Sequence, residues 1–199
     1  MNEASMQHSS DSVLKTIYAR HSVRSFAPTI VNSATIQTLL DAAVHAPTAM
    51  HEEPWAFVVV QNQALLQRVS DTAKPIFVEE LRHRNAHGAS QSFDHFIRPD
   101  FNIFHGASTL IIICARPLGS FVVADCWLAA ENLLLAASAM GLGSCVIGSA
   151  VAALNIHKVK KELGIPDEYS AVAPIIIGVP SGETPPTSRK EPAILSWKK

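Results

Sequence analysis

The chain has 199 residues, which suits one domain, and 48% of them are hydrophobic, which supports a packed core. Sixteen Lys and Arg against seventeen Asp and Glu give a net charge of −1, so no overall positive field attracts nucleic acid or an anionic membrane. We therefore expect a globular protein that binds neither nucleic acid nor a membrane.

The first part of the chain predicts two helices and a strand. A helix is expected over about residues 11–20. A second helix begins at an N-cap, Asn32 or Ser33, and ends near His45, because a short polar side chain there can accept from the first free backbone N–H groups. The β-branched run WAFVVV, residues 55–60, predicts a short buried strand.

The rest of the chain alternates helical stretches with two further apolar strands. One or two helices are expected near residues 65–81, a long one near 122–140, and a shorter one over 155–163 that opens with Asn155 as its cap. The strands are STLIIICA, residues 108–115, and SAVAPIIIGV, residues 170–179. This order predicts a single domain of the α+β class.

Three segments have no regular period. Residues 1–10 are polar and predict a disordered tail. Residues 83–100 are rich in His and Ser and predict a variable loop or a lid. Residues 180–199 contain several prolines and predict an extended tail over the surface, with the apolar stretch AILSW near its end docked on the protein.

Cysteine usage and the N-terminus indicate the compartment. Cys114, Cys126 and Cys145 lie in apolar surroundings without the spacing of a zinc site or a disulfide framework, so we expect buried thiols in a reducing environment. The polar N-terminus lacks the apolar run of a secretory signal. Together these features predict a cytoplasmic protein.

The most apolar segment of the chain is FVVADCWLAAENLLLAASAMGLG, which starts at Phe121. It is long enough to resemble a membrane span, but Asp125, Glu131 and Asn132 interrupt it. We therefore expect a buried helix. Because its apolar residues surround most of the circumference, it needs cover on every side, and a second subunit could supply part of that cover.

The stretch RHSVRSF, residues 20–26, gathers positive charge in an otherwise neutral chain. No GxxxxGK[ST] loop occurs, and no GxGxxG turn follows a strand. An anion held without such loops needs guanidinium and hydroxyl donors, which Arg20, Ser22 and Arg24 supply. Taken alone, such a cluster is more often a solvated, weakly paired surface group than an anion site.

Four motifs follow one another along the chain. The residues that carry the two N-terminal motifs are Arg20, His21, Ser22, Arg24 and Phe26, followed by Ala46, Pro47, Thr48, Pro54 and Trp55. Farther on come the long helix with the Gly-rich turn GLGSCVIGS, and the last strand with the basic tail TSRKEP. Together, in this order, the motifs resemble the FMN-dependent nitroreductase family, the NAD(P)H-dependent flavin oxidoreductases. The resemblance implies a central mixed β-sheet flanked by helices, in an intertwined homodimer.

The resemblance implies FMN as the cofactor and assigns the basic residues to it. Arg20 and Ser22 match residues that hold the FMN phosphate, within a motif that also includes His21. Arg189 or Lys190 of the tail matches the cations that close over the phosphate from the same subunit. The remaining cation, Arg24, matches a residue at the pyrimidine side of the flavin, where positive charge favours the reduced form. An ordinary surface arginine is the alternative for Arg24.

The loop after the second helix is implied to reach the flavin of the neighbouring subunit through Pro47, Thr48, Ala49 and His51. His51 stands where the family usually has Asn, and Glu53 where it usually has Gln. A histidine can titrate near neutrality, so His51 is a candidate proton donor to the substrate and our one catalytic assignment, with a solvent-facing loop residue as the alternative. Glu53 is expected to point away from the cofactor, because a carboxylate there disfavours reduced flavin.

The Gly-rich turn supplies the last implied flavin contacts. Gly148 matches the residue whose backbone N–H points to flavin N5, and a glycine suits a close approach to a flat ring. Val146 and Ile147 would pack beside the ring. The alternative is that this glycine-rich stretch only caps the preceding helix, a role that either Gly141 or Gly143 can fill.

The implied activity is transfer of hydride from NADH or NADPH through FMN to an electron-poor acceptor, such as a nitroaromatic or a quinone. One pocket that serves two flat substrates in turn implies ping-pong kinetics. The alternatives are a flavin carrier or sensor, or a branch of the family that acts on the flavin itself or on a halogenated substrate. No metal is expected.

Overall fold

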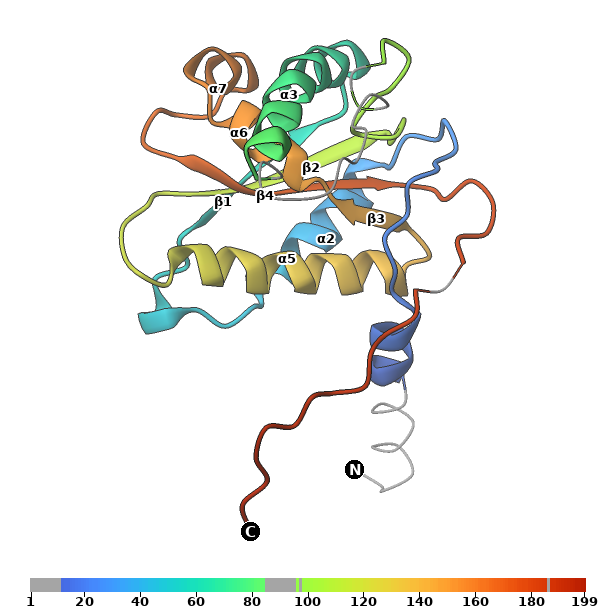
Figure 1. The fold of residues 1–199 in the computed structure, drawn as a ribbon, viewed down its shortest axis with the longest axis vertical. Coiled ribbons are helices and arrows are strands. Elements are labelled where there is room, and N and C mark those ends of the chain that lie inside the picture. The colour runs from blue at the N-terminus through green and yellow to red at the C-terminus, as the bar shows by residue number, and fades with distance from the viewer. Residues whose placement is uncertain (1–11, 85–95, 97, 186) are drawn as a thin grey trace.

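The computed structural model describes residues 12–84, 96, 98–185 and 187–199 (Figure 1). The predicted N-terminal tail and most of the predicted loop or lid at residues 83–100 lie outside the described residues. The first described residues, 12–19, are helical, as the sequence predicted. This helix ends where the backbone N–H of Arg20 donates to Thr16 O at 3.0 Å.

A four-stranded sheet forms the centre of the fold, in the order β1-β2-β4-β3. The three predicted strands are present as β1 (Trp55–Val60), β2 (Thr109–Ala115) and β4 (Ser170–Gly178). The fourth, β3 (Gly143–Val146), was missed. Its sequence GSCV is short and lacks the β-branched run that marks the others, and it becomes a strand because it pairs with β4.

Pairing within this sheet is antiparallel at each strand-to-strand contact. The mixed character expected for the sheet is confined to an isolated parallel bridge between Ser22 and Ser144. A second isolated bridge, which is antiparallel, joins Phe26 to Pro180. The RHSVRSF stretch is therefore attached to the sheet by one bridge to β3 and by one to the residues that follow β4.

Helices cover both faces of the sheet, which gives the α+β architecture (Figure 1). One face packs against α2 (Ser33–Val44) and α5 (Val122–Ala139). The other face packs against α3 (Gln63–Arg84) and α6 (Val151–Leu154), and the short α7 (His157–Leu163) completes this layer. The sequence left open whether residues 65–81 form one helix or two. The structure has one continuous helix there, α3, with Pro75 inside it.

The two central strands are buried on both sides, which explains their uninterrupted apolar runs. Leu110 and Ile112 of β2 belong to the core under α3 and α6. Their neighbours Ile111 and Ile113 belong to the core under α2 and α5. Alternate side chains thus face opposite layers, and a polar residue at either position would be buried without water.

Two predicted helix caps have different outcomes. Asn32 caps α2, because its Oδ1 accepts from the backbone N–H of Thr35 at 2.8 Å. Asn155 is not an N-cap: it ends α6, and α7 begins after Ile156 without a side-chain cap. Instead, the amide of Asn155 exchanges two hydrogen bonds with the backbone of Ala171 at 2.9 and 3.0 Å. Its role is to join this turn to the start of β4.

Helix α5 is buried on one side only. By length and hydropathy it is the one described helix that could cross a membrane, yet 44% of it is buried in this fold against the sheet and α2. Its opposite side exposes Val123, Trp127 and Leu128, with 56%, 41% and 45% of each residue accessible. A single chain therefore covers only one side of a helix that was predicted to need cover on every side.

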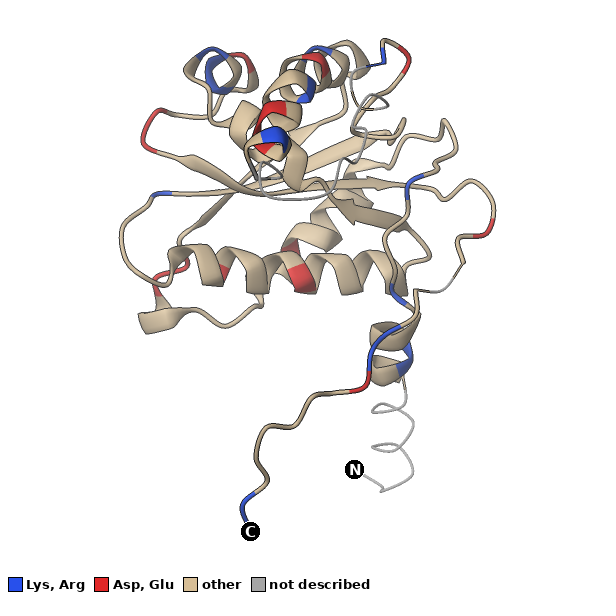
Figure 2. Cartoon of the chain, viewed as in Figure 1, with Lys and Arg blue, Asp and Glu red and all other residues tan. Residues whose placement is uncertain are grey.

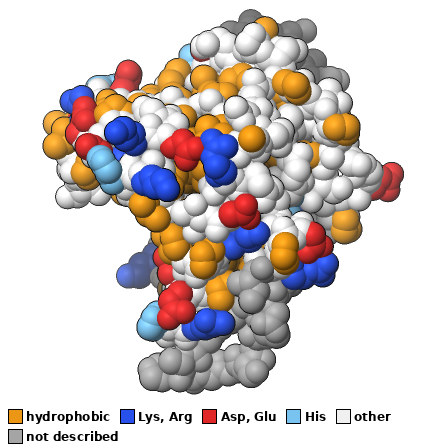
Figure 3. Space-filling view, turned by 90° about the horizontal axis from the view of Figure 1, so that it is seen from above, with side chains coloured by type: hydrophobic (Ala, Val, Ile, Leu, Met, Phe, Trp, Pro, Cys, Tyr) orange, Lys and Arg blue, Asp and Glu red, His pale blue; other side chains and the backbone are white. Residues whose placement is uncertain are grey.

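The face over α3 and α7 has a different character. Basic and acidic side chains are interspersed there (Figure 3). Arg68 of α3 donates to Glu162 of α7 at 2.7 Å, and His157 Nδ1 lies 3.0 Å from Asp167 Oδ1. Such pairing leaves no single-sign field on this face of the described structure.

The C-terminal tail leaves the domain beside the N-terminal helix (Figure 1). Its described residues form no helix or strand after Gly178, as the sequence predicted. The predicted docking of its apolar end is not met within this chain, because Ile194, Leu195 and Trp197 are 62%, 99% and 74% exposed.

Candidate active site

The RHSVRSF stretch is fixed to the sheet by its backbone. Val23 N donates to Ser144 O at 3.0 Å, and Ala27 N donates to Val179 O at 2.9 Å. Ser181 N then donates to Ser25 O at 2.9 Å, which ties the start of the C-terminal tail to the same stretch. The two basic ends of the chain are therefore brought to one edge of the sheet, where Figure 2 shows their cations on the same side of the molecule.

Two glycines make room for this attachment. Gly143 of β3 and Gly178 of β4 are partners in the sheet register, and the ring of Phe26 lies over them. A Cβ at Gly178 would lie 2.7 Å from Phe26 Cδ1, and a Cβ at Gly143 would lie 2.8 Å from Val23 Cγ1. Gly143 therefore has a packing role, and the helix cap is Gly141, whose φ is +73° and whose N–H donates to Ser138 O.

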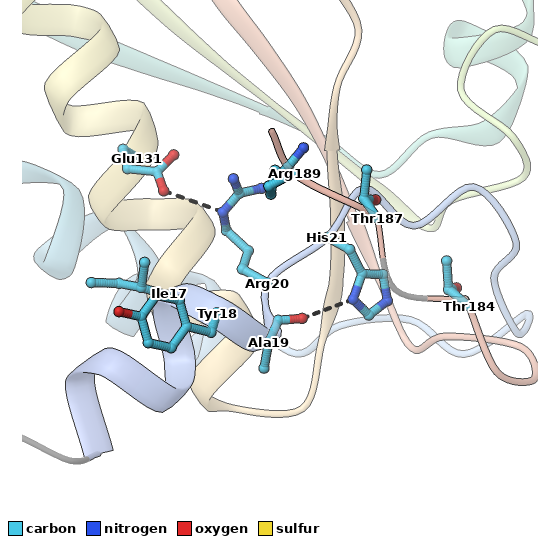
Figure 4. Close-up of a pocket in the computed structure, with 9 residues that line it drawn as sticks. All are labelled: Ile17, Tyr18, Ala19, Arg20, His21, Glu131, Thr184, Thr187 and Arg189. Carbon is cyan, nitrogen blue, oxygen red and sulfur yellow. Dashed lines mark hydrogen bonds and ion pairs between the residues drawn. The ribbon is translucent and has the colours of Figure 1, made fainter. Parts of the chain in front are cut away.

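A basic cavity of about 430 Å³ opens where the two chain ends meet (Figure 4). Arg20 and Arg189 both line it, from segments at opposite ends of the sequence. His21 also lines it, with Nδ1 2.8 Å from Ala19 O. The remaining lining residues are Ile17, Tyr18, Ala19, Glu131, Thr184 and Thr187.

The charge balance of this cavity favours an anion. Among the described residues that line it, Glu131 of α5 is the one carboxylate, against two guanidinium groups. Glu131 Oε1 lies 3.2 Å from Arg20 Nε, but the N–H is not directed at it, so Nε is buried with no hydrogen-bond partner among the described residues. A buried donor of this kind is costly unless a ligand satisfies it. The threonine hydroxyls add further donors suited to anion oxygens.

A second cavity, of about 370 Å³, lies beside the other end of the same stretch. Arg24 lines it, together with Val146, Ile147 and Gly148 at the end of β3 and the start of the 3₁₀ turn η2 (Gly148–Ala150). A Cβ added to Gly148 would meet nothing within 4 Å, so its backbone faces open space. The rest of the wall is mainly aromatic and comes from Phe77, Phe96, Phe101, Ile103, His105 and Ser149.

Not every predicted site residue lies at these cavities. Ser22 is held by its bridge to Ser144 and lines neither of the two, and Lys190 is exposed on the tail. The loop from Pro47 to His51 lines neither cavity as well. Within one chain, therefore, this loop does not meet the basic stretch.

The predicted partner-facing loop has an unusual backbone. It contains the 3₁₀ turn η1 (Ala49–His51), and Met50, His51 and Glu53 have φ of 56°, 56° and 43°. Left-handed backbone in residues other than glycine costs about 1–3 kcal/mol each and clusters at functional sites. His51 and Glu53 are both exposed.

Asp125, a buried residue of α5, forms a hydrogen bond with the backbone of this loop. Its Oδ1 accepts from the backbone N–H of Ala49 at 3.3 Å, across 76 residues of sequence. The residue is 3% exposed, and its Oδ2 has no hydrogen-bond partner among the described residues. The acidic interruption in the apolar helix thus has a structural use, which the sequence did not reveal.

Comparison with known proteins agrees with this geometry. The sequence model of the Nitroreductase family matches residues 17–179. The chain belongs to the Nitroreductase family. A nitroreductase from Bacteroides fragilis, crystallised with bound FMN, is 26% identical and superposes with a TM-score of 0.77 over 94% of this chain and 98% of the other.

Two relatives show the range of the Nitroreductase family near this chain. A protein from Archaeoglobus fulgidus with the provisional name NADH dehydrogenase/NAD(P)H nitroreductase is 29% identical over 175 residues, which cover 85% of this chain and 86% of the relative. An iodotyrosine deiodinase from Thermotoga neapolitana is 25% identical over 155 residues, which cover 76% and 80%. Membership in the Nitroreductase family indicates that the chain is an oxidoreductase.

Several residues at the cavities of this nitroreductase-family chain were missed by sequence reasoning. Their places depend on tertiary contacts, and their sequence surroundings carry no motif. Phe77 lies in the middle of a helical pattern, and Thr184 and Thr187 lie in a proline-rich tail. The cavity residues missed are Phe77, Phe96, Phe101, Ile103, His105, Glu131, Ser149, Thr184 and Thr187. Asp125, which contacts the loop and lines neither cavity, was missed as well.

The cysteines do not contribute to either cavity. Cys114, Cys126 and Cys145 are free and buried, which confirms the prediction of small apolar core residues. Burial raises the pKa of the Cys114 thiol to about 12 and that of Cys126 to about 11. Both therefore stay protonated at neutral pH and are poor nucleophiles.

Loss of the Asp125 carboxylate is expected to loosen the loop. In Asp125→Ala, the amide N–H of Ala49 should exchange with solvent on the order of tenfold faster, because a charge-assisted hydrogen bond is removed. Asp125→Asn retains an acceptor oxygen and should keep most of the protection. Hydrogen exchange measured by NMR tests this, with Asp41→Ala on the exposed side of α2 as the control. Unchanged protection of Ala49 in Asp125→Ala would contradict the assignment.

Proposed function

We propose that this chain is an FMN-dependent oxidoreductase that uses NADH or NADPH to reduce electron-poor acceptors, such as nitroaromatics or quinones. The observation that carries the proposal is that one short stretch, RHSVRSF, contributes an arginine to each of the two cavities. Arg20 lines the basic cavity and Arg24 lines the aromatic one. Four extended residue steps span at most about 14 Å, so one elongated ligand with an anionic end and a flat end suits both.

The basic cavity fits a terminal phosphate. Arg20 Nε is buried without a hydrogen-bond partner among the described residues, and Arg189 lines the same cavity. Guanidinium forks match phosphate oxygens in pairs of parallel hydrogen bonds. Arg20 and Arg189 would hold the charge, and Thr184 and Thr187 offer hydroxyl donors. Ser22 and Lys190 remain proposed phosphate contacts, although neither lines this cavity in the single chain.

The aromatic cavity fits the flavin ring. Bound there, FMN would supply the chemistry of accepting and delivering hydride. Val146 and Ile147 would pack along the ring, and the backbone N–H of Gly148 would serve as a donor, because open space lies in front of that glycine. Arg24 would place positive charge at the polar edge of the ring.

A homodimer completes the site in this proposal. The loop with Pro47, Thr48, Ala49 and His51 lines neither cavity of its own chain, which supports a role at the flavin of a second copy. The exposed apolar side of α5 and the undocked tail end offer the surfaces for an intertwined two-fold pair. His51, exposed on that loop, would then be able to donate a proton to the acceptor.

The two substrates would use the aromatic cavity in turn. A nicotinamide and a nitroaromatic or quinone are both flat, so one open cavity above a single ring supports ping-pong kinetics. Buried, free thiols suit a reducing compartment, which supports a place in the cytoplasm.

A second candidate is reduction of a halogenated aromatic, or passive holding of the flavin as a carrier or sensor. The likeness to an iodotyrosine deiodinase favours the dehalogenating variant. The geometry of the aromatic cavity does not distinguish these activities from nitroreduction, because an aromatic wall suits flat rings of each kind.

The first test concerns the cofactor and its reduction. The purified protein should be yellow and should release FMN, not FAD, on denaturation, because the basic cavity suits one terminal phosphate. Mixing it with NADH or NADPH without oxygen should bleach the flavin absorbance near about 450 nm within seconds. Later addition of a nitroaromatic or a quinone should restore the colour. A protein that keeps its FMN oxidised with both nicotinamides would be a flavin holder, and one that releases FAD or no flavin would contradict the proposal.

A further inference from the structure

His105 occupies a strained turn at the wall of the aromatic cavity. Its φ is +52°, and Gly106 follows with φ of +72°. The neighbours Phe104 and Ala107 are each only 1% exposed, so the turn is anchored in the core on both sides. A left-handed histidine costs about 1–3 kcal/mol and persists only where the surrounding structure determines it.

Hydrogen bonds hold this turn in place. The backbone N–H of His105 donates to Asn102 O at 3.0 Å, and that of Phe104 donates to Asn102 Oδ1 at 2.8 Å. Asn102 Nδ2 in turn donates to Gln67 Oε1 of α3 at 2.8 Å. The turn is therefore built to one geometry, and that geometry places the imidazole at the cavity.

The imidazole itself is left with unused hydrogen-bonding capacity. None of the hydrogen bonds among the described residues uses a ring nitrogen of His105, and its one ring contact is edge-on to Phe101 at 5.8 Å between centroids. Burial and the nearby positive charge of Arg24 lower the pKa of His105, so the ring is neutral at pH 7. A neutral imidazole has one donor and one acceptor nitrogen.

We propose that His105 is a further cofactor-contacting residue, which hydrogen-bonds the polar edge of the flavin ring beside Arg24. The inference rests on the proposed function, because it takes FMN as the occupant of this cavity. The polar edge of a flavin carries both C=O acceptors and an N–H donor. Arg24 can only donate, whereas neutral His105 can donate to a carbonyl or accept from the N–H. In the proposed contact His105 donates to a C=O group of that edge, beside the donors of Arg24.

A donor at this edge affects the two redox states of the cofactor unequally. Reduction increases the negative charge on the pyrimidine side of the ring, so a hydrogen bond from His105 strengthens there. His105 is therefore expected to favour binding of reduced over oxidised FMN. This differential effect separates a contact residue from one that only shapes the protein.

The test compares the FMN affinity and the midpoint potential of His105→Gly, of His105→Gln and of the unaltered FMN-bound protein. Glycine adopts the left-handed backbone without strain, so His105→Gly should keep the fold. It should weaken binding of oxidised FMN about threefold. The loss of affinity for reduced FMN should be about tenfold larger than the loss for oxidised FMN. That tenfold difference lowers the two-electron midpoint potential by about 30 mV. His105→Gln, which keeps both a donor and an acceptor, should recover most of the loss.

The matched control is His157→Ala, because His157 lies on α7 and lines neither cavity. A direct readout on the unaltered protein is the ¹⁵N NMR signal of the His105 ring, which should move when FMN is added to flavin-free protein. An unmoved ring signal, or His105→Gly with the affinity and potential of the unaltered protein, would overturn the inference and leave the proposed function standing. Failure of the unaltered protein to bind FMN at all would overturn both.

Discussion

Arg20→Ala is expected to weaken FMN binding by about 10- to 100-fold while the fold remains intact. The loss corresponds to one charge-assisted contact of about 1.5–3 kcal/mol. Arg20 is well placed for such an effect because its side chain is only 22% exposed and its Nε has no hydrogen-bond partner among the described residues. Stability should change little, because the exposed carboxylate of Glu131 gains access to water when its ion pair is lost.

Fluorescence titration of flavin-free protein with FMN measures this change. Lys15→Ala is the matched control, since Lys15 is an exposed cation of the preceding helix and does not line the basic cavity. Arg20→Lys should fall between the two, because an ammonium group keeps the charge but not the paired geometry. Arg189→Ala should resemble Arg20→Ala, and the double variant should lose less than the sum, because both side chains would bind one phosphate. An FMN affinity that Arg20→Ala leaves unchanged would remove Arg20 from the phosphate site.

Trp127→Glu is expected to dissociate the proposed homodimer and to release its flavin. Trp127 lies on the exposed apolar side of α5 with Val123 and Leu128, and a carboxylate buried without a partner in an apolar interface is strongly unfavourable. The loop that carries His51 would then be lost from the partner's site. Because FMN would bind across the interface, assembly and flavin binding are linked, and loss of one weakens the other.

Light scattering combined with flavin fluorescence over a dilution series tests this linkage. The unaltered protein should lose FMN over the same concentration range in which it separates into single chains, and Trp127→Glu should do so at much higher concentrations. Ile156→Glu is the control, because Ile156 is also partly exposed but lies between α6 and α7 on the opposite side of the sheet. A single chain that retains FMN at every concentration would rule out a shared site.

Local chemistry explains the features that the sequence predicted well. The buried strands β1, β2 and β4 follow from runs of β-branched residues, and the start of α2 follows from the side chain of Asn32. Each of these signals acts between residues that are close in the chain, so a short window of sequence contains the whole cause. The RHSVRSF stretch belongs to the same group, because its charge is concentrated within seven residues.

The features that escaped prediction depend on residues that are distant in the chain. β3 exists because GSCV lies beside β4, and the basic cavity exists because the register of that pair leads the tail and Arg189 back toward Arg20. The contact of Asp125 with the loop spans 76 residues.

By itself, the sequence predicted the fold class, the family motifs and the cations of the proposed phosphate site, because propensity, capping and charge are properties of neighbouring residues. Only the tertiary structure decided which cations share a cavity, that two glycines seat Phe26, and that His105 faces the same space as Arg24. These arrangements depend on sheet register and on the packing of the two helical layers, and neither is encoded in any one segment.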